Sequence, residues 1–179
     1  MEVQTFAIEG LKLFIPRVFS DARGYFFESF QRERYREHGV PVDDLLQENV
    51  SRSSRNVLRG LHFQRPPMAQ GKFVQVLYGR VIDVAVDLRP DSQTYGKHVM
   101  VELSEENHAQ FWVPAGFAHG FLALEDETVF TYKVTALYSP EHDGGVLWND
   151  PDLGIQWPVK NPVVSEKDAR LPLFKDLPR

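Results

Sequence analysis

The sequence predicts a mainly β protein in which residues 1–179 form one β-barrel or jelly roll with a few short helices. Strand-like segments of alternating apolar and polar residues recur at short spacing along the middle of the chain. Twelve glycines and twelve prolines supply the turns that such a fold needs. Neither an internal repeat nor a low-complexity linker divides the chain, so a single domain is predicted.

The most regular alternation falls between residues 73 and 103. Residues 73–78 and 81–88 flank Gly79-Arg80 and are predicted to form two strands around a tight turn. The second strand has an apolar face and a face with two aspartates, namely Ile82, Val84, Val86 and Leu88 opposite Asp83 and Asp87. The same pattern predicts further strands at residues 99–103, 110–113, 117–124 and 129–135.

Two short helical segments are predicted outside the strands. Ser29 has the character of a cap for a helix over residues 31–37, which ends at Gly39. Ser165 and Asp168 have the spacing of a capping box that opens a short turn near the C-terminus.

Composition excludes several classes of function. The chain has no cysteine, which removes disulfides, thiolate metal sites and a cysteine nucleophile, and fits a reducing compartment. A formal net charge of −5 argues against nucleic-acid or anionic-membrane partners. The first residues do not form a secretory signal, and the apolar stretch 111–124 is too short and interrupted to span a bilayer. We therefore expect a cytoplasmic protein.

Common catalytic motifs are also missing. The sequence has no glycine-rich dinucleotide or phosphate loop and no GxSxG elbow. His62 and His119 lie in strand-rich segments, but two histidines rarely hold a metal firmly. Lys72 lies where a carboxylate ligand would be needed, and its positive charge would repel a cation. No metal site is predicted.

Ordered motifs along almost the whole chain carry a family resemblance. Residues 114–119 resemble the second motif of cupin barrels, and Gly60-Leu61-His62 with the following strands resembles a degraded first motif. The chain more specifically resembles the dTDP-4-dehydrorhamnose 3,5-epimerases, which implies a cupin-type jelly-roll β-barrel. The matching segments occur in the family's order at compatible spacing, and they are 21–28, 47–49, 58–64, 70–72, 112–121, 132–133, 138 and 165–168.

The resemblance implies epimerisation of a dTDP-4-keto-6-deoxy sugar without a metal or redox cofactor. The substrate's C4 ketone stabilises an enolate when a proton leaves C3 or C5, so the protein supplies a base, an acid and a group for the enolate oxygen. By resemblance, His62 is the base, Asp168 its partner, Tyr132 the acid on the opposite face and Lys72 the enolate-stabilising group. Without the resemblance, each residue also fits a purely structural role. His62 could be a core histidine and Asp168 a helix cap. Tyr132 could be a packing tyrosine and Lys72 a solvent-exposed lysine.

The family also implies a set of substrate contacts. Arginine suits the diphosphate because its guanidinium binds phosphate oxygens in bidentate fashion, and Arg23 and Arg59 are the matching arginines, with Arg55 and Arg65 as weaker alternatives. The implied binding residues are Phe19, Arg23, Glu28, Gln47, Glu48, Asn49, Arg59, Lys72, His119, Tyr138, Asp143 and Lys167. Asp143 departs from the family pattern, which often has glutamate there.

Family members are homodimers that exchange N-terminal segments, so Phe19, Arg23 and Glu28 are expected to reach the partner's barrel. Tyr138 is expected to stack on the thymine, with Phe19 on its other side. Three alternatives stay open at this point: a single-centre epimerase acting at C3 or C5, a metal-dependent cupin, and a non-catalytic carbohydrate-binding barrel.

Overall fold

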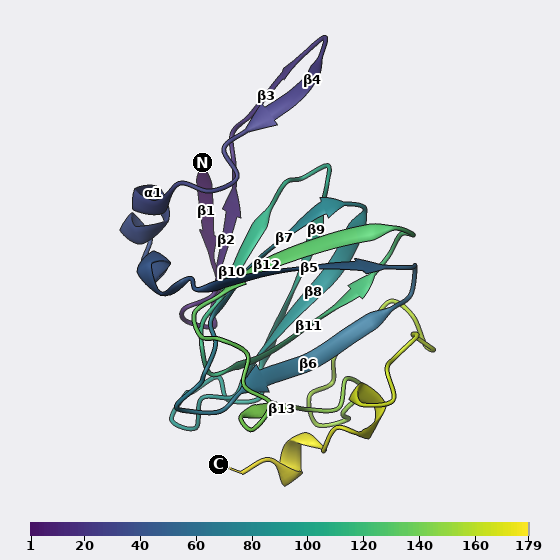
Figure 1. The fold of residues 1–179 in the computed structure, drawn as a ribbon. Helices are drawn as coiled ribbons and strands as arrows, with labels where there is room; N and C mark the ends of the chain where they lie inside the picture. The colour runs from purple at the N-terminus through teal and green to yellow at the C-terminus, as the bar shows by residue number, and fades with distance from the viewer. Residues whose placement is uncertain (179) are drawn as a thin grey trace.

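The computed structural model describes residues 1–178, which form two antiparallel β-sheets packed face to face (Figure 1). The first sheet has the strand order β1 (Glu2–Thr5), β2 (Lys12–Ile15), β10 (Gln110–Val113), β7 (Lys72–Tyr78), β12 (Thr128–Val134) and β5 (Gln47–Ser53). The second sheet has the order β13 (Asp143–Gly145), β6 (Leu58–Gln64), β11 (Phe117–Ala123), β8 (Arg80–Asp87) and β9 (His98–Ser104). The predicted mainly β class with few helices is confirmed.

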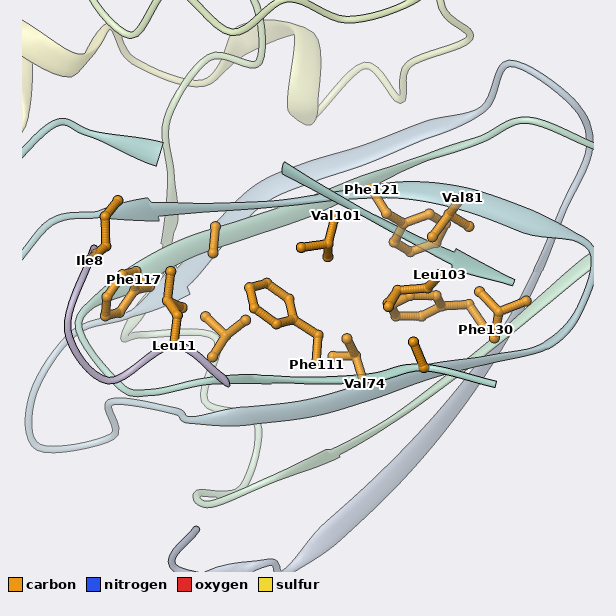
Figure 2. Close-up of a cluster of buried hydrophobic side chains, with 14 residues drawn as sticks. Ile8, Leu11, Val74, Val81, Val101, Leu103, Phe111, Phe117, Phe121 and Phe130 are labelled. Carbon is orange, nitrogen blue, oxygen red and sulfur yellow. The ribbon is translucent and has the colours of Figure 1, made fainter. Parts of the chain in front are cut away.

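Aromatic side chains from both sheets fill the space between them (Figure 2). Phe111 and Phe130 come from the first sheet, and Phe117 and Phe121 come from the second. The rings of Phe121 and Phe130 stack with centroids 4.1 Å apart. Full burial of each such ring contributes roughly 1.5–3 kcal/mol, so this cluster is a main source of stability.

The strands on either side of Gly79 do not pair with each other, in contrast to the tight two-stranded turn that the sequence predicts. β7 lies in the first sheet and β8 in the second, so the chain crosses between sheets at this point. Gly79 has a φ of +78°, and an added Cβ would lie 2.6 Å from Oγ1 of Thr128. Glycine is required because the corner combines left-handed backbone with close packing.

Both faces of β8 are buried. Val81 and Ala85 face the core between the sheets, while Val84 and Val86 pack beneath the C-terminal segment with Leu153. The predicted apolar face therefore lies outside the barrel, under a covering layer. The two aspartates of β8 lie on the core-facing side and are fully buried.

The helices are short. α1 (Arg32–Glu37) begins one residue later than predicted, and its cap is Gln31, whose side chain accepts from the Arg34 amide, rather than Ser29. Three 3₁₀ turns follow, η1 (Val42–Asp44), η2 (Asp168–Arg170) and η3 (Phe174–Asp176). Within residues 1–178 no helix has the length and apolar composition to cross a bilayer.

A two-stranded hairpin, β3 (Val18–Asp21) and β4 (Gly24–Phe27), projects away from the two sheets (Figure 1). Its strands pair only with each other, as a separate two-stranded sheet. The sequence pattern did not predict this hairpin as strands, because three consecutive aromatic residues interrupt any alternation after Gly24.

Candidate active site

A cavity of about 460 Å³ opens beside the core and is walled by strands of both sheets. A second hollow of about 310 Å³ adjoins it and shares four of its lining residues, which are His62, Lys72, Tyr132 and Lys167. Of these shared residues, His62, Lys72 and Tyr132 are predicted catalytic residues. The remaining predicted catalytic residue, Asp168, lines the larger cavity. The structure thus brings all four predicted catalytic side chains to one place.

His62 and Asp168 form a hydrogen-bonded pair at the cavity wall. Nε2 of His62 lies 2.7 Å from Oδ1 of Asp168, although the two residues are 106 positions apart in the sequence. The carboxylate also accepts from the Gly60 amide at 3.1 Å and from the Ser165 hydroxyl. Burial opposes ionisation of Asp168, but these hydrogen bonds outweigh it and lower the pKa of the carboxyl. An ionised carboxylate only accepts, so Nε2 of neutral His62 carries the proton and Nδ1 keeps a lone pair.

The predicted capping box around Ser165 is present in altered form. The Asp168 amide donates to the Ser165 hydroxyl oxygen at 3.1 Å, as a cap requires. The Asp168 carboxylate, however, contacts His62 and Gly60 as well as the serine. One residue therefore serves both the turn and the pair, which the sequence presented as competing roles.

The close approach of β6 and β11 sets the position of this pair. A Cβ on Gly60, whose φ is +131°, would lie 2.6 Å from the Gly120 Cα, so only glycine fits. The strands pair with His62 opposite His119, and the register shifts between His119 and Phe121. The glycine contact thereby places two histidines side by side on the cavity wall.

Lys72 is a buried cation at the junction of the two hollows, with 9% of its surface exposed. Its ammonium group donates to the backbone carbonyl of His62 at 3.2 Å. Burial lowers the pKa of Lys72 to about 8, against the opposing attraction of Asp83 and Asp143. The cavity therefore holds a positive charge with little solvent around it.

His119 is buried beside the cavity and bound to an aspartate of the neighbouring strand. Its Nε2 lies 2.9 Å from both carboxylate oxygens of Asp83, which is fully buried. Burial lowers the pKa of His119 more than Asp83 raises it, so the ring is neutral near neutral pH.

Tyr132 lies on β12 with its ring against the core and its hydroxyl near Asn49. Burial raises the pKa of the Tyr132 phenol above its ordinary value, and the hydrogen bond with Asn49 and the nearby charge of Arg59 offset this only in part. The hydroxyl is consequently protonated at neutral pH and is able to donate a proton.

Most predicted binding residues line the two hollows. Arg59, His119 and Lys167 line the larger one. The smaller one is lined by Gln47, Asn49, Tyr138, Asp143 and Lys167. Asp143 forms an ion pair with Lys167, and its carboxylate lies 3.4 Å from the Tyr138 hydroxyl.

Four predicted binding residues lie elsewhere in the chain. Glu48 points to the outer face of β5, where its carboxylate binds the Lys133 ammonium at 2.6 Å. Phe19 and Arg23 lie on the projecting hairpin, and Glu28 follows it and pairs with Arg34. The hairpin residues line a separate hollow of their own.

Asp83, which binds His119 beside the cavity, is a residue that sequence reasoning did not nominate. The available signal was an acidic residue inside the apolar run 81–86, because an unpaired carboxylate is not buried at such a position without a partner. Within residues 1–178, no three histidine, aspartate, glutamate or cysteine side chains converge as a metal site.

Comparison with known proteins identifies the family. The family model described as dTDP-4-dehydrorhamnose 3,5-epimerase matches residues 5–176. The chain belongs to the dTDP-4-dehydrorhamnose 3,5-epimerase family. A member from Sinorhizobium fredii is 52% identical over 180 aligned residues, which cover 99% of this chain and 92% of that protein.

Solved structures of family members share the fold. The dTDP-6-deoxy-D-glucose-3,5-epimerase of Legionella pneumophila, in complex with dTDP-4-keto-L-rhamnose, has a TM-score of 0.94 and 46% identity, covering 99% of this chain and 94% of its own. A 3′-monoepimerase from Streptomyces bikiniensis, in complex with dTDP-quinovose, has a TM-score of 0.90 and 33% identity. The match covers 95% of this chain and 86% of the monoepimerase chain. The jelly-roll architecture is therefore common to double and single epimerases.

Proposed function

We propose that this protein converts dTDP-4-dehydro-6-deoxy-D-glucose to dTDP-4-dehydro-L-rhamnose by inverting C3 and C5. The observation that carries the proposal is that a histidine–aspartate pair, a buried cation and a protonated phenol converge on one cavity. The pair is His62 with Asp168, the cation is Lys72 and the phenol is Tyr132. Sequence identity of about half to family epimerases supports the same reaction.

The first chemical step is removal of a proton from the carbon next to the ketone. Nδ1 of His62 has the free lone pair, and Asp168 stabilises the imidazolium that forms when the C–H proton arrives. The electron pair of the broken C–H bond moves into the C4 ketone and gives an enolate. Lys72 supplies a positive charge for the enolate oxygen in a poorly hydrated site, where such an interaction is strong.

The second step returns a proton to the opposite face of the same carbon. Tyr132 comes from the first sheet, while His62 comes from the second, so the two groups approach the cavity from different walls. The phenol gives its proton to the carbanion carbon as the enolate collapses back to the ketone. His62 then releases its proton and Tyr132 regains one by exchange with solvent, which restores the base and the acid. Repetition at the second carbon completes the double inversion, and the substrate ketone serves as electron sink both times.

The diphosphate and the thymine of the substrate need separate contacts. Arg59 and Lys167 provide positive charge along the larger cavity for the phosphate oxygens. Tyr138 lines the smaller hollow with 56% of its surface exposed, which leaves its ring free to stack on thymine.

We also propose a cytoplasmic homodimer in which the β3–β4 hairpin contacts the partner's site. The hairpin exposes aromatic rings that monomers normally bury, with Phe19, Tyr25 and Phe26 exposed to 52%, 57% and 70%. Phe19 and Arg23 line neither of the two hollows that hold the catalytic residues of their own chain, so in the proposed dimer they act at the partner's site. Light scattering of the purified protein tests the dimer.

Proton NMR in deuterated buffer tests the reaction. We expect both the C3 and C5 hydrogens of the substrate to exchange with solvent and both centres to invert, with activity unaffected by a chelator. Exchange and inversion at one carbon only would assign a single-centre epimerase of the Streptomyces type, and loss of activity in chelator would assign a metal-dependent cupin. Binding without exchange would leave a carbohydrate-binding barrel.

A further inference from the structure

We propose that His108 is a positioning residue for the β3–β4 hairpin and sets the direction in which Phe19 and Arg23 reach the partner's site. The inference rests on the proposed function, in which the chain forms a homodimer and the hairpin contacts the second copy. His108 lies in the turn between β9 and β10 and lines neither hollow that holds the catalytic residues. It therefore acts through the hairpin rather than on the substrate.

The two faces of the hairpin have different surroundings. Phe19 pairs with Phe26 across the hairpin, so their side chains share one face. This face is open, with Phe19 52% and Phe26 70% exposed. Tyr25 and Phe27 flank Phe26 on β4, so their side chains point to the opposite face. The orientation of that second face decides where the first one points.

The ring of His108 packs against the second face. Its centroid lies 4.6 Å from that of Tyr25 and 4.7 Å from that of Phe27, with interplanar angles of 46° and 32°. The Tyr25 and Phe27 rings also stack at 6.1 Å, so the three rings form one cluster, and such contacts are favourable. Within residues 1–178 the hairpin strands pair only with each other, so this cluster replaces the strand pairing that would otherwise fix their direction.

The turn that carries His108 is itself held in place. The Asn107 side chain accepts from the amides of Ser104 and Ala109 at 3.0 and 2.9 Å, and it donates to the Glu102 carbonyl at 3.0 Å. His108 has a φ of +51°, a left-handed conformation that histidine and asparagine adopt more readily than most residues. The ring therefore projects from a fixed turn, and His108→Asn removes the ring while suiting the same backbone.

Both legs of the hairpin are attached close to His108. The preceding strand, β2, pairs with β10 through Phe14 opposite Gln110. The chain after the hairpin is fixed at Ser29, whose carbonyl accepts from the Gln110 side chain at 2.6 Å. The hairpin thus stands on one narrow base at the start of β10. The contact with His108, two residues before Gln110, sets its tilt on that base.

A matched control lies outside the hairpin. His38, directly after α1, is half-buried like His108, and its ring centroid lies 6.0 Å from that of Phe14. Phe14 belongs to β2, so His38→Asn removes the same side chain from an aromatic contact of the barrel. A general need for a histidine ring would affect both substitutions alike. Only His108→Asn is expected to loosen the hairpin.

Hydrogen exchange by mass spectrometry and calorimetry with dTDP test the inference without turnover. We expect His108→Asn to speed amide exchange in residues 18–27 and to weaken dTDP binding, each by about fivefold, which corresponds to the loss of a favourable aromatic contact. His38→Asn should leave both quantities unchanged. An unchanged dTDP affinity in a dimeric His108→Asn protein would overturn the proposal.

Mixed dimers separate positioning of the hairpin from a loss of stability in the substituted chain. A His62→Ala subunit paired with a His108→Asn subunit has one competent base, and that site receives an intact hairpin, so we expect wild-type KM. With both substitutions in one subunit opposite a wild-type subunit, the competent site receives the loosened hairpin, and KM should rise about fivefold. The two dimers carry the same substitutions, so equal KM values would overturn the proposal.

A measurement on the wild type alone stands if His108→Asn does not fold. Nuclear Overhauser effects should connect the His108 ring with the rings of Tyr25 and Phe27, and their absence would overturn the proposal. Failure of the proposed function is distinguishable. A monomer in light scattering would overturn the dimer and this inference together. Absence of epimerisation by the wild-type dimer would overturn the reaction alone, because dTDP calorimetry still reports on the hairpin.

Discussion

The two histidine–aspartate pairs at the cavity consist of the same residue types but lie in different surroundings. The His62 side chain is 32% exposed, and its aspartate arrives from a distant turn near the C-terminus. The His119 side chain is 6% exposed, and both oxygens of its aspartate lie on one ring nitrogen from the neighbouring strand. An accessible ring with one nitrogen free is suited to proton transfer, whereas a buried ring is suited to holding a fixed hydrogen-bond acceptor. Burial, rather than residue identity, separates the two roles.

The strongest test of this comparison replaces each histidine with alanine. We expect His62→Ala to lower kcat by about 10⁴-fold, because the base is lost, while dTDP binding is retained. His119→Ala should act mainly on KM, by about tenfold, since it loses one hydrogen bond. Steady-state kinetics and calorimetry with dTDP measure both effects. A larger kcat loss for His119→Ala would reverse our assignment.

The partner of the base gives the next largest effect. Asp168→Asn removes the charge that stabilises the imidazolium and fixes its tautomer, so we expect kcat to fall by about 10³-fold. Rate measurements under substrate saturation check this. Because the His62 side chain remains, activity above that of His62→Ala is required; equal losses would mean that Asp168 acts only through folding.

The acid is expected to affect only half of the reaction. Tyr132→Phe removes the proton donor, so we expect inversion to fall by about 10²-fold while exchange of the substrate's hydrogens with deuterium continues through His62. Tyr138→Phe is the control, because stacking does not need its hydroxyl, and it should leave exchange and inversion intact. Equal loss of exchange and inversion in Tyr132→Phe, together with weaker binding, would make the hydroxyl a binding contact.

The smallest effect is on acid stability. The pKa of Asp168 is lowered in the folded protein, so its stabilisation is present above the unfolded pKa and is lost as pH falls through the folded one. We expect Asp168→Asn to be less stable than wild type by about 2 kcal/mol at neutral pH. This difference should shrink below about pH 4. Urea denaturation at several pH values checks this difference, and Asp91→Asn, at an exposed position, is the control expected to stay near wild type. A stability difference that does not change with pH would contradict the lowered pKa of Asp168 in the folded protein.

Sequence alone predicted the central strands because their alternation is local. The strands at 110–113, 117–124 and 129–135 appear within one or two residues of the predicted limits. The pairing of β7 and β8 was wrong, because a glycine corner and a hairpin turn have the same local pattern, and only packing of the whole chain decides which sheet each strand joins. Alternation on β8 was present, but it could not reveal that the C-terminal segment covers the apolar face.

The candidate site was predictable as far as motifs carried it. His62, Lys72, Tyr132 and Asp168 meet at one cavity, although the sequence separates the first and last by 106 positions. Asp83 was not nominated because its partner is on another strand, and a buried acid is recognised only when that partner is known. The roles proposed for the hairpin residues depend on a second copy of the chain, and the local pattern of one sequence does not show where that copy binds.

The projecting hairpin has a consequence for protein quality control. A free two-stranded hairpin has little stability of its own, and exposed strand edges with aromatic rings template aggregation. Asp21 and Arg23 at its turn form an ion pair that interrupts the apolar run, which is the usual position of gatekeeper charges. In the proposed dimer, a variant that blocks contact between the hairpin and the partner is therefore expected to be removed by chaperones and proteases, or to precipitate, before it accumulates as an inactive protein.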